Sequence, residues 1–95
     1  MTDTLAALRD AVDEADAALV RALAARWRAI QAIGAHKRAR GIEGYDPSRE
    51  RALRERWSAL ADEAKLDRAL CDAVFDVVIA RCRDEVSARP SSEND

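Results

Sequence analysis

The longest uninterrupted pattern in the sequence is a helical one that runs from Thr4 to about Arg40. This segment contains no proline and a single glycine, Gly34. Apolar residues recur in it mostly in steps of three and four, the spacing of one face of an α-helix, at Leu5, Leu8, Val12, Ala15, Leu19, Leu23, Ile30 and Ile33. The pattern predicts one long helix, which Gly41 and Gly44 close in the segment GIEGYDP.

A helix of this length is too long for the rest of the chain to cover. Its roughly 36 residues span about 54 Å at 1.5 Å per residue, whereas a compact domain of about 100 residues has a radius of gyration near 13 Å. The remaining residues must therefore leave part of the apolar stripe exposed. We predict that a second copy covers it, in a symmetric homodimer whose long helices pack against each other.

The remainder of the sequence predicts two shorter helices. Pro47 suits the first turn of a helix over about residues 47–64, and Asp46 just before it suits the N-cap. Asp67 can cap a third helix that reaches about Val86 or Ser87.

Composition agrees with an all-helical chain. Only 4% of the residues are aromatic, with three glycines and two prolines, and good helix formers dominate. We therefore expect an all-α protomer of one long and two shorter helices. Residues 1–86 would form the domain, and residues 87–95 a disordered tail.

The charge pattern argues against a polyanionic partner. The 16 basic and 18 acidic residues alternate along the chain and give a net charge of −2. No apolar run approaches the roughly 20 residues of a membrane span, and the amino-terminal MTDTLAALRD is acidic where a signal peptide is basic. We expect a cytoplasmic protein that binds neither nucleic acid nor membrane.

Few side chains suit metal binding or nucleophilic catalysis. Cys71 and Cys82 form no C-x-x-C pattern, and the single His36 is too little to complete a zinc site. His36 lies in the long helix beside Lys37, far in sequence from either cysteine, which does not suit a catalytic triad. We expect two buried free thiols, no metal and no cofactor.

Two cations lie inside the apolar stripe of the long helix. At about 100° per residue, Lys37 falls about 20° from Arg26 and about 16 Å along the axis, within the stripe. An unpaired buried charge is costly, so each needs a partner. Either the charged segment with Asp46, Arg49 and Glu50 neutralises them, or an anionic ligand does.

Three parts of the sequence together strongly resemble the all-helical class of chorismate mutase. They are the segment LRDAVDEADAALVRALAARWRAIQAIGAHK, the segment YDPSRE and the LD pair before the third helix. The resemblance covers about Leu5 to Val86. Its most specific matches are the Leu-Arg-x-x-x-Asp-x-x-Asp opening around Arg9, the spacing of Arg26, Gly34 and Lys37, and the Asp-x-x-Arg-Glu of Asp46, Arg49 and Glu50.

Members of that class are three-helix protomers intertwined as a homodimer with two active sites. They convert chorismate to prephenate in aromatic amino-acid biosynthesis, on the shikimate pathway. The resemblance implies that Arg26, with an Arg9 from the other subunit, holds the two substrate carboxylates. It implies that Lys37 faces the ether oxygen of the breaking bond.

The resemblance assigns the rest of the site to the second and third helices. Glu50 would accept a hydrogen bond from the substrate hydroxyl, assisted by groups around Asp46 and Arg49. Where the family has a glutamine that gives the ether oxygen a second donor, this chain has Val86. Where the family has a small polar residue shortly before that glutamine, this chain has Cys82. The departure at Val86 leaves room for a weak mutase, for one that needs a partner enzyme, or for a relative acting on a modified chorismate.

Two other functions stay open at the level of the sequence. An isochorismate-pyruvate lyase uses a similar cation set, although the intact Asp46, Arg49 and Glu50 segment favours the mutase. A non-catalytic helical dimerisation module would need only the apolar stripe, and it predicts no affinity for chorismate-like dicarboxylates.

Overall fold

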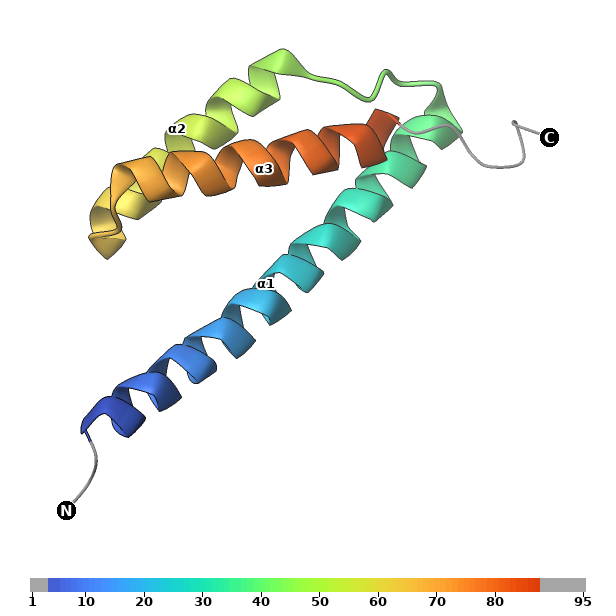
Figure 1. Ribbon diagram of the computed structural model, residues 1–95. Helices are drawn as coiled ribbons and strands as arrows, with labels where there is room; N and C mark the ends of the chain where they lie inside the picture. The colour runs from blue at the N-terminus through green and yellow to red at the C-terminus, as the bar shows by residue number, and fades with distance from the viewer. Residues whose placement is uncertain (1–3, 88–95) are drawn as a thin grey trace.

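The computed structural model describes residues 4–87, and these residues form three α-helices without a strand (Figure 1). Helix α1 spans Thr4–Arg40, α2 spans Pro47–Ala64 and α3 spans Arg68–Ser87. These bounds confirm the three helices predicted from the sequence. Residues 88–95, which hold nearly all of the predicted tail, and residues 1–3 lie outside the described residues.

Local side-chain chemistry explains where α2 and α3 begin. Asp46 has an extended backbone, and its carboxylate accepts a hydrogen bond of 3.1 Å from the backbone N–H of Arg49. The carboxylate of Asp67 accepts in the same way from the N–H of Leu70, at 3.0 Å. Both predicted N-caps are confirmed, and each satisfies a backbone donor that the first helical turn leaves free.

Two residues in the left-handed conformation turn the chain after α1 and α2. Gly41, with φ of 66°, follows α1, as expected for a residue without a Cβ. Lys65, with φ of 58°, ends α2, and its N–H bonds to the carbonyls of Ala61 and Asp62. The sequence gives no signal for this turn, because a lysine has no preference for the left-handed conformation.

Helix α3 packs against both α1 and α2, and α2 and α3 run antiparallel, side by side (Figure 1). At their contact Phe75 is 2% exposed, and its ring meets Trp57 edge to face with centroids 5.1 Å apart. The small core consists of Ala61, Cys71, Phe75, Ile79 and Cys82. Both cysteines are therefore buried free thiols, as predicted.

The apolar stripe of α1 is largely uncovered in a single protomer. The amino-terminal half of α1 diverges from α2 and α3 (Figure 1), and Leu8, Val12 and Leu19 are 55–60% exposed. The Cα radius of gyration is 17.6 Å, against about 13 Å for a compact chain of about 100 residues. The two shorter helices therefore leave the stripe open, as the length of α1 predicts.

Leu60 of α2 does not join the core. Its spacing of three residues from Trp57 predicts a place on the inward face of this helix, but it is 46% exposed. It lines a shallow apolar hollow at the corner between α2 and α3, together with Leu66, and not the core around Phe75. A position at the edge of a helix contact explains the difference.

Candidate active site

A cavity of about 290 Å³ lies where α1, the loop 41–46, α2 and α3 meet. Its apolar wall includes Ile30, Ile33, Leu53 and Ile79. Every site residue proposed from the sequence except Arg9 lines it, namely Arg26, Lys37, Asp46, Arg49, Glu50, Cys82 and Val86. Residues from three separate helices thus converge on one small space.

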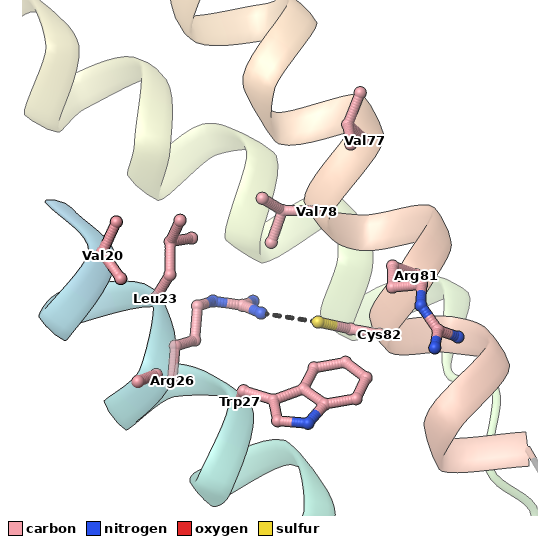
Figure 2. A pocket seen from close by; sticks show the side chains of 9 residues that line it. Val20, Leu23, Arg26, Trp27, Val77, Val78, Arg81 and Cys82 are labelled. Atoms are coloured by element: carbon pink, nitrogen blue, oxygen red, sulfur yellow. Dashed lines mark hydrogen bonds between the residues drawn. The ribbon is translucent and has the colours of Figure 1, made fainter. Parts of the chain in front are cut away.

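Two half-buried cations of α1 reach into this cavity. They lie 11 residues apart, or about three helical turns, which places them on the same face of the helix. The guanidinium of Arg26 donates a hydrogen bond of 3.0 Å to the Sγ of Cys82 on α3 (Figure 2). The ammonium of Lys37 donates one of 3.0 Å to the carbonyl of Gly44.

Neither cation forms an ion pair with a carboxylate in the described part of the chain. Within residues 4–87, the carboxylates form ion pairs with Arg54, Arg68 and Arg83, and none with Arg26 or Lys37. The segment around Asp46 therefore makes no direct ion pair with either cation among the described residues. The cavity thus contains two cations that pair directly with no carboxylate of residues 4–87.

Glu50 is held by Arg83, a residue that no sequence motif indicates. Arg83 of α3 donates two hydrogen bonds to its carboxylate, from Nε at 2.8 Å and from Nη2 at 2.7 Å. These hydrogen bonds raise the pKa of Arg83. The guanidinium also lies 4.6 Å from the ring centroid of Tyr45. The sequence contains one indication that Arg83 belongs to the site. Arg83 lies three residues before Val86, and residues at this spacing share a face of a helix.

A close backbone contact joins the loop 41–46 to the end of α3. A Cβ added to Gly44 would lie 2.8 Å from the carbonyl oxygen of Val86, closer than real side chains come. Only glycine allows the loop to approach the helix this closely. The contact places the Gly44 carbonyl where it accepts from Lys37.

The remaining predicted residues differ in what they offer to a ligand. Cys82 is buried and Val86 half-buried, so both form the wall of the cavity. The carboxylate of Asp46 is already engaged as the cap of α2. Arg49 is exposed at the rim.

Arg9 is not part of this cavity. It lies on α1, 17 residues before Arg26, which corresponds to about 25 Å along the axis. Its side chain is exposed. Within one protomer the structure therefore does not bring Arg9 together with the other predicted residues.

A second hollow, of about 520 Å³, lies between α1 and α3 (Figure 2). Arg26 and Cys82 stand between the two spaces and line both. The hollow is otherwise mainly apolar, and Val20, Leu23, Val77 and Val78 line it together with Trp27 and Arg81. It continues the open apolar stripe of α1.

No group of three or more potential metal ligands occurs among the described residues. Within residues 4–87, none of the helices has both the length and the apolar character needed to cross a membrane.

The fold and the site define an all-helical protein with a small, cation-lined cavity of the kind that holds an anionic ligand. Comparison with known protein families matches residues 8–86 to the family described as chorismate mutase type II. The chain belongs to this family, whose members are isomerases. The resemblance found in the sequence is thereby confirmed. No curated protein and no solved structure matches the chain.

Proposed function

We propose that the chain rearranges chorismate to prephenate in the 290 Å³ cavity, with chorismate as the ligand that neutralises its cations. The observation that carries this assignment is that Arg26 and Lys37 enter the cavity without a carboxylate partner among residues 4–87. Chorismate carries two carboxylates. The cavity is also close to the lower end of the roughly 300–1,000 Å³ range of small-molecule sites.

The reaction suits the groups that the cavity contains. It is a rearrangement within one substrate molecule, and it requires no nucleophile, no metal and no proton transfer. The protein must hold the enolpyruvyl arm over the ring in the reactive conformer. It must also place a fixed positive charge where negative charge develops on the ether oxygen.

Helix α1 would supply the two main contacts. Arg26 would hold one carboxylate with the donors that Cys82 leaves free. Lys37 would face the ether oxygen, since its hydrogen bond to Gly44 uses only one of the three ammonium donors. That bond also fixes the direction of a long side chain that would otherwise rotate freely.

Helices α2 and α3 would complete the site. Glu50 would accept a hydrogen bond from the substrate hydroxyl, and Arg49 at the rim would add positive charge. Asp46 would act through the start of α2, which its carboxylate caps. Cys82 and Val86 would shape the wall beside the ether oxygen.

The second substrate carboxylate would be held by Arg9 of another copy of the chain. Arg9 is too far along α1 to reach the cavity of its own protomer, and its surroundings favour pairing with a second helix. Leu8 and Val12, next to it on α1, are 60% and 57% exposed. In an intertwined homodimer, each α1 would give Arg26 and Lys37 to one site and Arg9 to the other.

The proposed activity also implies a domain, a location and a pathway. Residues 1–86 would carry the activity without a cofactor, in the cytoplasm, as a step of aromatic amino-acid biosynthesis. The family match favours this function over the isochorismate-pyruvate lyase and the non-catalytic dimerisation module.

The test is an absorbance assay that follows the loss of chorismate, with the product identified. We expect prephenate. Release of pyruvate from isochorismate, with chorismate unchanged, would identify a lyase instead. No turnover of either substrate would leave the dimerisation module.

Light scattering tests the dimer. We expect about twice the chain mass of 10.5 kDa at micromolar concentration, because the stripe of α1 is open in one copy. A mass equal to that of one chain would contradict the shared site.

A further inference from the structure

We propose that Arg83 is a positioning residue of this site, which holds the carboxylate of Glu50 in one orientation at the cavity wall. The inference rests on the proposed function, in which Glu50 contacts the substrate hydroxyl. It concerns a residue that neither the sequence motifs nor the resemblance assigns to the site.

The hydrogen bonds between the two side chains fix the plane of the carboxylate. Nε and Nη2 of Arg83 each take one oxygen of Glu50, at 2.8 and 2.7 Å. A paired contact of this kind adds geometric definition to charge attraction, because the guanidinium fork is rigid. Glu50 belongs to α2 and Arg83 to α3, so the pair also joins these two helices at the cavity.

A third element limits the movement of Arg83. Its guanidinium lies 4.6 Å from the ring centroid of Tyr45, which follows Gly44 in the loop 41–46. One side chain thus contacts the loop and α2 while belonging to α3. The Glu50 side chain is 23% exposed and that of Arg83 44%, so water screens the pair only in part.

The pair also changes the net charge of the cavity wall that a substrate would contact. An unpaired Glu50 would repel a ligand with two carboxylates. With Arg83 bound to it, the negative charge of Glu50 is offset. Arg26, Lys37 and Arg49 are then left to face the ligand.

A second ion pair provides a matched control outside the cavity. Arg54 of α2 donates a hydrogen bond of 2.7 Å to Asp76 of α3, and its guanidinium lies 4.5 Å from the ring centroid of Phe75. In both places an arginine joins α2 to α3 and lies against an aromatic ring, although Arg54 donates one hydrogen bond where Arg83 donates two. The hydrogen bond that Arg54 donates to Asp76 raises the pKa of Arg54, as the hydrogen bonds to Glu50 raise the pKa of Arg83. Arg54 does not line the 290 Å³ cavity.

The experiment compares Arg83→Met with Arg54→Met in the chorismate assay and in thermal unfolding. We expect Arg83→Met to lower kcat/KM on the order of tenfold, the loss typical of a charge-assisted hydrogen bond. Arg54→Met should keep the wild-type kcat/KM while lowering the melting temperature at least as much. Arg83→Lys should recover part of the activity, since lysine keeps the charge but not the fork. This variant also provides the test if Arg83→Met does not fold.

A double variant separates positioning from general stability. In a Glu50→Ala background there is no carboxylate to hold, so Arg83→Met should lower kcat/KM further by less than about twofold. A full additive loss in that background would overturn the positioning role. So would wild-type kcat/KM in Arg83→Met, or an equal loss in Arg54→Met. If the wild-type chain does not turn over chorismate, both the proposed function and the positioning role of Arg83 are wrong. An active wild type with an unaffected Arg83→Met overturns the positioning role alone.

Discussion

The ammonium of Lys37 donates a hydrogen bond of 3.0 Å to the backbone carbonyl of Gly44. The bond ties the last turn of α1 to the loop that leads into α2. It satisfies Lys37 without neutralising it, because a carbonyl is a dipole and not an anion. The cation is therefore held in place and still available to a negatively charged ligand.

Replacing this cation should remove most of the activity while the fold persists. We expect Lys37→Ala to lower kcat by on the order of 10²-fold or more, since a preorganised donor at a developing oxyanion contributes a few kcal/mol. Arg40→Ala is the matched control, because Arg40 lies in the same turn and contacts His36 outside the cavity. Equal rates for the two variants, with unchanged circular dichroism, would make Lys37 a structural cation.

The close approach of Gly44 to Val86 should be essential for the site. In Gly44→Ala the new Cβ meets the Val86 carbonyl at 2.8 Å, so the loop must move and carry the acceptor away from Lys37. We expect a destabilisation of about 1–3 kcal/mol in denaturant unfolding, together with a loss of activity.

Gly41→Ala is the control for that change. Gly41 has a φ of 66° but open space around its Cβ position. The alanine should therefore cost about 1 kcal/mol of stability through backbone strain and leave kcat/KM near that of the wild type. If Gly41→Ala lowers activity as much as Gly44→Ala, the effect arises from the loop as a whole and not from the contact.

Val86 is the position where a new donor should improve the enzyme. It lines the cavity but offers no hydrogen bond, so we expect Val86→Gln to raise kcat by on the order of tenfold. Val86→Leu changes the side-chain volume without adding a donor and should give no gain. Equal rates in the two variants would mean that the site needs no second donor at this position.

Most of the fold can be predicted because its determinants are local. Asp46 and Asp67 mark helix starts through hydrogen bonds that span three residues, Pro47 marks one through its fixed φ, and the structure places the helices there. The common face of Arg26 and Lys37 follows in the same way from the period of one helix.

The contacts between helices could not be predicted, because they depend on how the helices are rotated against each other. The bond of Arg26 to Cys82 joins residues 56 positions apart, and the pair of Arg83 with Glu50 joins residues 33 apart. No local sequence pattern indicates a contact between residues so far apart in the sequence. The sequence therefore shows which side chains share a face of one helix, but not which partner each meets on the next.

The central claim is that each site combines Lys37 of one chain with Arg9 of another, and mixed dimers test it most directly. Arg9→Ala and Lys37→Ala chains, each nearly inactive alone, are unfolded together and refolded as an equal mixture, so that about half of the dimers contain one of each. Every mixed dimer then has one doubly defective site and one intact site. We expect activity to return to roughly a quarter of the wild-type level, because half of the dimers carry one good site of two. If Arg9 and Lys37 act within one chain, every site keeps one defect. A mixture as inactive as its two parents would therefore contradict the shared site.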